Sequence, residues 1–395
     1  MKVLRCCLAL ALASFAVFGL GACGNLDDVT TVHDLRVLAL KAEYVSVDSM
    51  GMMQIFAGFL VPLDDPGSLT TTTPTVTALV VDPQRPNDVL TMSAEACPDY
   101  LDTITSASGR STKLCPGKDV TDAFGPTLGP ALATSEIPPS AWPNIDTSTI
   151  EYDPKIMYGL TPQQLALFFT LPPGADPNPS TTDDPFTKAI RYNRDFGLDA
   201  IVNPTFTLGA ETASAIKRVV YWPLLPPDLA QVGPALDGGE CPPTQIPNRN
   251  PELMDVGFFH KRTDGIPSDP YAAGQTPAIS VATDELYVQP AYDPSAAEYY
   301  RLRRRDDNTG EIKTECDHET LIFQFFATAG TFAPAERTSV LPAIFDQTAR
   351  VPLDSQYKPP KGDALPKDGV VTIWVVTRDE RAGASWTSRK IMVMP

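Results

Sequence analysis

The sequence contains few histidines and none of the common catalytic or metal-binding motifs. Its three histidines, His33, His260 and His318, lie far apart along 395 residues. It has no H-E-x-x-H, no G-x-S-x-G and no C-x-x-C pattern. A histidine-dependent triad would therefore have to join distant segments. These absences argue against an enzyme, and we expect no resident cofactor.

Basic residues are also scarce. The chain has 31 Lys and Arg against 48 Asp and Glu, a formal net charge of −17. A nucleic-acid backbone would repel so acidic a chain, so nucleic acid is not an expected partner. Acidic turns at 64–65, 183–184 and 306–308 make calcium the most plausible metal ion. None of them matches an EF-hand loop, and Asp is also a common turn former.

Proline, by contrast, is abundant, with 40 residues, about twice the usual share of about 5 %. Proline is excluded from helix interiors and from central strands. The composition therefore favours short elements and long loops, meaning a mainly β fold with little helix. A chain of this length also exceeds one ordinary core, which predicts two or more domains.

The first residues have the pattern of an export signal. A basic start (MKVLR) precedes an apolar run over residues 6–20, and Leu20-Gly21-Ala22 then precedes Cys23. The letters GLGACG also match a nucleotide-binding turn. Such a turn needs a strand before it and a helix after it. Residues 25–40 show no helical pattern of apolar residues, so we reject the nucleotide-binding interpretation.

The segment around Cys23 resembles the lipobox of bacterial lipoproteins. The resemblance implies cleavage before Cys23 and acyl chains, such as palmitate, on this residue. Two or more acyl chains give durable membrane attachment. Gly24 follows this cysteine in place of an Asp, and in some bacteria that favours the outer membrane. We therefore expect a lipid-anchored protein of the cell envelope, on its periplasmic or surface face.

The remaining cysteines form an even set once Cys6, Cys7 and Cys23 are assigned to the leader and the anchor. The four are Cys97, Cys115, Cys241 and Cys316. An even set in an exported chain predicts two disulfides, with three connectivities open. We favour pairing the first two with each other and the last two with each other, because each bond then stays within one domain.

Short apolar runs between Pro, Gly and Asp turns predict strands on both sides of a proline-rich segment. The expected strands are 34–47, 52–61, 75–82, 88–97, 215–224, 252–260, 298–305, 311–316, 321–330, 370–379 and 385–394, with one helix at 161–169. The expected organisation is a signal peptide (1–22), a tether (23–33), an N-terminal β-sandwich with a loop-rich insertion (34–224), a linker (225–250) and a C-terminal β-sandwich (251–395).

One basic stretch interrupts the acidic chain. The residues are Arg301, Arg303, Arg304 and Arg305, beside Tyr299 and Tyr300. They suit an anionic partner such as a polysaccharide or a lipid head group. The alternative is a solvated hairpin strand whose arginines pair with local acids.

Several short motifs occur as a set: DLRVLALKAE, ALVVDP, AIKRVV, NRNP and VVTRDERAGASW. With them the chain resembles a group of lipoproteins from myxobacteria and their relatives. The resemblance implies two tandem immunoglobulin-like sandwiches and brings no catalytic residues. The chain departs from the pattern at Ala382, where Arg-Gly-Gly is expected, and this predicts a changed hairpin turn.

Together these patterns predict a non-catalytic binding or structural role, with an envelope protein or a polysaccharide as partner. The alternative is an envelope hydrolase or a carbohydrate-processing accessory protein.

Overall fold

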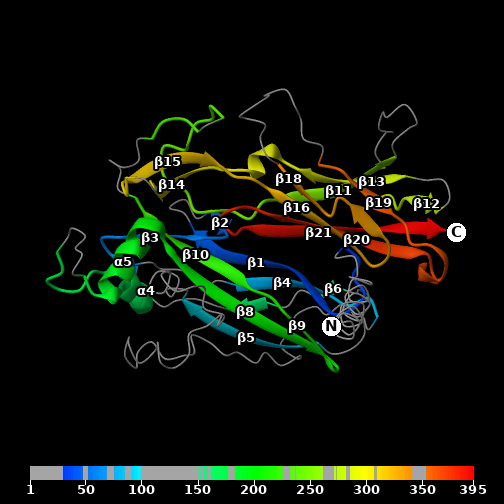
Figure 1. The fold of residues 1–395 in the computed structure, drawn as a ribbon, viewed down its shortest axis with the longest axis horizontal. Helices are drawn as coiled ribbons and strands as arrows, with labels where there is room; N and C mark the ends of the chain where they lie inside the picture. Colours follow the sequence, from blue (N-terminus) through cyan, green and yellow to red (C-terminus); the bar gives the residue numbers. More distant parts are fainter. Residues whose placement is uncertain are drawn as a thin grey trace, which may run out of the picture.

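In the computed structural model the chain forms two β-rich lobes that pack against each other (Figure 1). The described part of the chain has two α-helices, and the predicted mainly β class is confirmed. The structure describes residues 30–47, 52–68, 75–84, 90–98, 151–152, 155–157, 162–176, 183–225, 232–235, 237–260, 271–272, 274–281, 285–306, 309–339 and 353–395.

The N-terminal lobe is a sandwich of two sheets around one apolar core. The first sheet has the order β2 (Met53–Phe56), β1 (Arg36–Val47), β4 (Thr75–Val81), β6 (Glu151–Tyr152), with β7 (Lys155–Met157) also paired to β4. The second has the order β3 (Phe59–Pro62), β10 (Lys217–Leu224), β8 (Leu198–Leu208), β5 (Leu90–Pro98), with β9 (Glu211–Ser214) beside β8.

Residues 52–61, expected as one strand, form two strands in different sheets. The chain crosses from β2 to β3 at Ala57-Gly58. A Cβ atom on Gly58 would lie 3.3 Å from the backbone oxygen of Val220. A glycine therefore allows the crossing chain to approach β10 closely.

Two helices close one end of this lobe. Helix α4 (Pro162–Phe169) confirms the helix expected at 161–169. Helix α5 (Pro185–Phe196) was not expected. Asp184 caps it, accepting hydrogen bonds from the backbone nitrogen (3.1 Å) and the hydroxyl (2.6 Å) of Thr187. An Asp-Pro pair at a helix start is a local signal that the sequence analysis missed.

The C-terminal lobe is a second sandwich that carries an additional hairpin. One sheet has the order β11 (Leu253–His260), β13 (Leu286–Tyr292), β19 (Ser355–Lys358), β17 (Thr331–Ala333). The other has the order β12 (Ala278–Ser280), β21 (Ala384–Met394), β20 (Val370–Arg378), β16 (Ile322–Ala327), β18 (Glu336–Thr338). The hairpin consists of β14 (Tyr299–Arg305) and β15 (Ile312–His318), close to the expected bounds.

A third apolar core joins the two lobes. Strand β20 places Ile373 and Val375 in its own sandwich, while Trp374 and Val376 face the N-terminal lobe. From that lobe, Leu79 of β4 packs into the same cluster. Strand β20 is therefore covered on both faces, which explains its nearly continuous apolar sequence.

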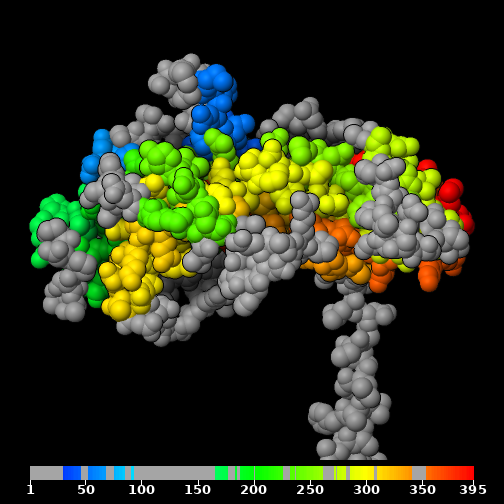
Figure 2. All heavy atoms as spheres, turned by 90° about the horizontal axis from the view of Figure 1, so that it is seen from above, coloured from blue at the N-terminus to red at the C-terminus, as the bar shows by residue number. Residues whose placement is uncertain are grey.

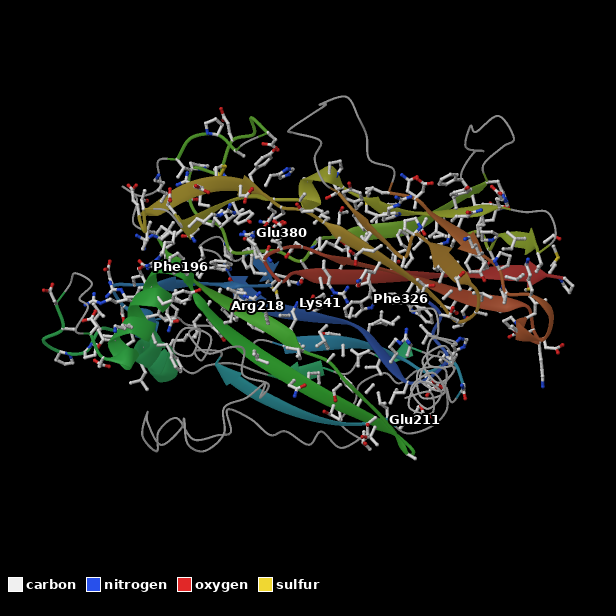
Figure 3. All side chains as sticks on the ribbon, viewed as in Figure 1. Lys41, Phe196, Glu211, Arg218, Phe326 and Glu380 are labelled. Carbon is white, nitrogen blue, oxygen red and sulfur yellow. A yellow bond between two sulfur atoms is a disulfide. The ribbon has the colours of Figure 1, made fainter. Side chains whose placement is uncertain are left out.

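Polar and aromatic contacts continue this junction. The guanidinium of Arg378 donates to the backbone oxygen of Leu38 across the lobes, at 2.7 Å. The ammonium of Lys41 lies 5.3 Å from the centre of the Trp386 ring. Figure 3 shows Lys41 and Phe326 in the space between the blue strand β1 and the strands of the C-terminal lobe.

The first described residues belong to the C-terminal lobe. Thr31 forms a parallel bridge with Ala327, and the backbone nitrogen of Val32 donates to the oxygen of Ala327 at 2.8 Å. Val32 is completely buried. The predicted tether (23–33) is therefore too long at its C-terminal end, because residues 30–32 are fixed by backbone pairing and burial.

Strands β1 and β2 form a ribbon that projects from the body of the molecule, visible in blue in Figure 2. Its edge strand exposes apolar side chains: Met53 is 69 % exposed and Ile55 is 54 % exposed.

We predict that the two lobes unfold as one unit and that Trp374→Ala lowers the free energy of unfolding by about 3–5 kcal/mol, because it leaves a large cavity in the shared core. Denaturant unfolding followed by circular dichroism measures both effects. Ile216→Ala, at a half-exposed side chain, is the control and should change stability by less than about 0.5 kcal/mol. Two separate transitions in the wild-type chain would contradict a shared core.

Candidate functional site

The described surface has a hollow of about 590 Å³ on the C-terminal lobe. Its walls come from the segment after the linker glycines, from the turn η5 (Pro294–Ala296) and from the first and last residues of the hairpin. Polar side chains in the walls are Glu240, Ser295, Glu298, Tyr299 and His318. The hollow combines carboxylates, a hydroxyl and two aromatic rings, which are groups that bind hydroxyl-rich or basic ligands.

A disulfide fixes one side of the hollow. Cys241 and Cys316 are bonded, with an S–S distance of 2.05 Å and Cα atoms 5.8 Å apart. This confirms one of the two predicted bonds. It joins residues 75 apart in sequence and stabilises the fold by about 4–5 kcal/mol in loop-entropy terms. Cys115 and the side chain of Cys97 lie outside the described residues, so their pairing stays a prediction.

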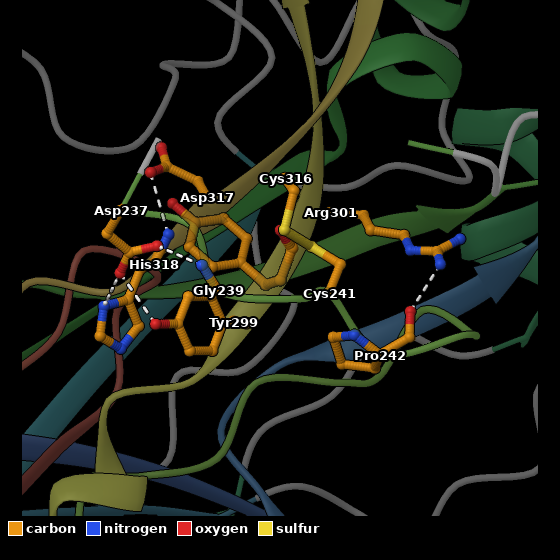
Figure 4. Close-up of a disulfide and its surroundings, with 10 residues drawn as sticks. Asp237, Gly239, Cys241, Pro242, Tyr299, Arg301, Cys316, Asp317 and His318 are labelled. Carbon is orange, nitrogen blue, oxygen red and sulfur yellow. Dashed lines mark hydrogen bonds and ion pairs between the residues drawn. A yellow bond between two sulfur atoms is a disulfide. The ribbon is translucent and has the colours of Figure 1, made fainter. Parts of the chain in front are cut away.

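Asp237 forms a second link between the linker and the hairpin (Figure 4). Its carboxylate accepts from the hydroxyl of Tyr299 at 2.8 Å and from the backbone nitrogen of Gly239 at 2.9 Å. It also lies 3.1 Å from Nδ1 of His318. Burial raises the pKa of Asp237, but these donors outweigh it, so the pKa lies below its ordinary value.

Tyr299 is held between two neighbours and therefore does not offer a free ring face. Its ring stacks on His318 with centroids 4.0 Å apart. A Cβ atom on Gly239 would lie 2.1 Å from a carbon of the Tyr299 ring, so glycine is required there. Residues 237–242 of the predicted linker thus contact the hairpin and form one wall of the hollow.

The arginines predicted as an anionic-partner patch all lie on β14, but they do not form one surface. They are Arg301, Arg303, Arg304 and Arg305. Neighbouring residues of a strand point to opposite faces, which divides the set. Arg301 is 8 % exposed and donates to the backbone oxygen of Pro242 at 2.5 Å. The predicted patch is therefore corrected, because Arg301 is buried.

The other three arginines have local contacts. Arg303 pairs with Asp195 of α5 at 2.6 Å. Arg304, on the opposite face, pairs with Asp317 at 3.1 Å. Arg305 lies 5.8 Å from the centre of the Phe196 ring. The pairing of hairpin arginines with nearby acids is the alternative that the sequence analysis described.

Behind the hollow, Arg381 organises a buried polar cluster at the junction of the lobes. Its guanidinium donates to Glu319 (2.6 Å), to Glu298 (2.7 Å) and to the side-chain oxygen of Asn248 (2.8 Å). The ring of Tyr300 lies 4.5 Å from the guanidinium carbon. The segments RDERAG and NRNP, which the sequence offers only as part of a resemblance, are in contact in the structure.

Further residues connect this cluster to the N-terminal lobe. The ammonium of Lys217 donates to the backbone oxygen of Ala382. The backbone nitrogen of Ala57 donates to the backbone oxygen of Asn248 at 2.7 Å. Asn250 bridges the lobes, donating to Ala42 at 2.8 Å and accepting from the nitrogen of Ala384 at 2.9 Å. The predicted linker (225–250) therefore ends in the interface.

Ala382 occupies the turn where the resemblance predicted glycine. Its φ angle is 72°, in the left-handed region. An alanine there costs about 1–2 kcal/mol, because its Cβ approaches the backbone. Within the turn, the nitrogen of Gly383 donates to the carboxylate of Asp379 at 2.6 Å. Ala382 is thus a strained residue in the turn between β20 and β21.

The carboxyl groups of the cluster outnumber its buried cations. Glu298, Glu319 and Asp379 lie near Arg381 and Lys217, and burial raises the pKa of all three carboxyl groups. Burial raises the pKa of Glu319 to about 8, although Arg381 opposes the shift. Burial also lowers the pKa of Lys217 to about 8. Burial therefore favours the protonated form of these three carboxyl groups more than it is favoured in free carboxylic acids.

One of the acidic turns considered for calcium, 183–184, has local partners. Asp183 pairs with Arg191 at 2.8 Å, and Asp184 caps α5. In the part of the chain that the structure describes, no three His, Cys, Asp or Glu side chains are placed to hold a metal ion. Cys23 lies outside the described residues. Among the helices that are described, none has the length and apolar character needed to cross a membrane.

Comparisons with known proteins give no family. No family model matches the chain, and no curated protein matches it. Among solved structures, the chain is similar to that of dimeric latent PorU from Porphyromonas gingivalis, with 8 % identity and a TM-score of 0.17. The match covers 92 % of this chain and 24 % of that one, so the chain spans about a quarter of its length. A TM-score this low supports no conclusion about fold or function.

We predict that the free energy of unfolding falls as pH rises from about 5 to 8. The pKa of Glu319 is higher in the folded state than in the unfolded chain, so its stabilising contribution is complete below the unfolded pKa and lost by the folded value of about 8. The slope has a limit of about 1.4 kcal/mol per pH unit. Denaturant unfolding at several pH values measures it. Glu319→Gln should flatten the profile, and an unchanged profile would show that another group is responsible.

Proposed function

We propose that this chain is a lipid-anchored protein of the cell envelope with a non-catalytic binding role. The proposal rests on the pattern of residues 1–23: a basic start, an apolar run and Leu20-Gly21-Ala22 before Cys23. The anchor would be a set of acyl chains on Cys23. The resemblance to lipoproteins with tandem immunoglobulin-like domains and the outer-membrane address belong to the same proposal.

The fold supports a short connection to the membrane. Thr30 is 1 % exposed, and its hydroxyl accepts from the backbone nitrogen of Phe332 at 3.1 Å. Residues 23–29 can span at most about 25 Å. A chain anchored at Cys23 therefore holds the C-terminal lobe close to the bilayer surface.

The hollow beside the hairpin is the binding surface that we assign to this role. The disulfide and the bonds of Asp237 fix its walls, and a rigid site loses less entropy on binding. Its carboxylates and ring edges suit a hydroxyl-rich or basic partner, as a polysaccharide or an envelope protein would present. Of the two carboxylates in its walls, Glu298 is paired with Arg381. We therefore favour binding over hydrolysis, for which both would have to serve the reaction.

We predict that Cys23→Ala moves the protein from the membrane fraction to the soluble fraction, because the residue that carries the acyl chains is lost. Fractionation of cells followed by immunoblotting measures this. Cys6→Ala is the matched control, since that cysteine lies in the leader, and it should leave the protein in the membrane fraction. A Cys23→Ala protein that stays there would rule out this anchor.

We also predict that a photoreactive residue in place of Ser295, an exposed residue of the hollow, forms a discrete crosslinked product in intact cells. Thr212 is exposed on β9, next to Glu211, which Figure 3 labels at the far end of the N-terminal lobe. The same residue there is the control and should give no such product. Equal products from both positions, or none from either, would count against the hollow as the binding surface.

A further inference from the structure

Arg301 is a buried cation that no described carboxylate neutralises. It lies in the middle of β14, opposite Cys316 on β15, and the linker covers it at Pro242. Only 8 % of the residue is exposed. Of the residues that the structure describes, no Asp or Glu forms an ion pair with it.

Its hydrogen-bonding capacity is largely unused. A guanidinium carries five N–H donors. The Nη2 atom of Arg301 donates to the oxygen of Pro242, while Nε and Nη1 are buried and have no partner among the described residues. The contrast with Arg381 is direct, because that buried arginine contacts two carboxylates and an amide oxygen. A buried cation with unused donors is unfavourable unless an anion completes its surroundings.

A second arginine on the same face of the strand has the same feature. Arg303 follows two residues later, and side chains at this spacing point to the same side. One of its nitrogens, Nη1, pairs with Asp195, but its Nε is buried without a partner. Arg301 and Arg303 therefore both carry unused N–H groups on the same face of β14.

We propose that Arg301 and Arg303 bind a small oxyanion, a phosphate or a carboxylate, beneath the linker at Pro242. Both anions accept paired N–H donors in the planar geometry of a guanidinium. A water molecule would satisfy the donors but would not neutralise the charge. The covalent link between Cys241 and Cys316 holds the linker over the site. The proposal does not depend on the anchor at Cys23.

The test is thermal unfolding of the purified full-length chain. Chloride in the buffer is replaced by inorganic phosphate or by acetate at constant ionic strength. In the wild-type chain the unfolding midpoint should rise with oxyanion concentration and then saturate. The anion that acts at the lower concentration identifies the ligand as a phosphate or a carboxylate. Arg301→Met should abolish the rise. Arg304→Met is the matched control, because Arg304 is 59 % exposed and lies on the opposite face, and it should respond like the wild type.

Two results would overturn the proposal. One is a wild-type midpoint that does not depend on the anion, as expected if water or a carboxylate of the chain itself fills the site. The other is an equal response in Arg301→Met. If that variant does not fold, Arg301→Lys keeps the charge but loses the paired donors. Calorimetric titration with phosphate should then show at least tenfold weaker binding, and equal affinity would also overturn the proposal.

Discussion

Burial of Trp374 between the two lobes is the constraint on which the rest of the structure depends. Its ring packs against β4 of the N-terminal lobe, while Ile373 and Val375 fill the other side of β20. Because β20 is covered on both faces, the second sandwich cannot complete its surface without the first. The backbone pairing of Thr31 with Ala327 adds to this dependence, since it fixes the start of the described chain on the lobe that is synthesised last.

The polar cluster around Arg381 follows from the same junction. Segments from both lobes meet around Arg381, and the backbone polar groups of these segments lose contact with water when the lobes pack together. Arg381 and Asn248 supply the donors and acceptors that replace this water, and Glu298 extends the cluster to the surface of the hollow. One side chain, Glu298, therefore belongs both to the interface and to the candidate site. Lobe packing and the shape of the hollow are thus linked through its pair with Arg381.

Local patterns predicted much of the strand content. The alternation at 321–330 and the Asn-Thr-Gly turn of the hairpin led to the observed β16, β14 and β15, because the period of a strand and the chemistry of a turn are local properties. Helix α5 was missed although Asp184-Pro185 marks its start. The split of residues 52–61 was missed because it depends on the approach of Gly58 to Val220, which lies more than 160 residues further along the chain.

The candidate site shows the same division. The sequence by itself determined the mainly β class and an even set of cysteines, from which the Cys241–Cys316 bond was correctly favoured. Only the tertiary structure decided which arginines of the basic stretch are exposed, and it buried Arg301 beneath Pro242. The tertiary structure also brings the segments NRNP and RDERAG into contact. The physical reason is that composition and periodicity act along the chain, whereas burial and charge pairing depend on contacts between residues that are 59 to 133 positions apart.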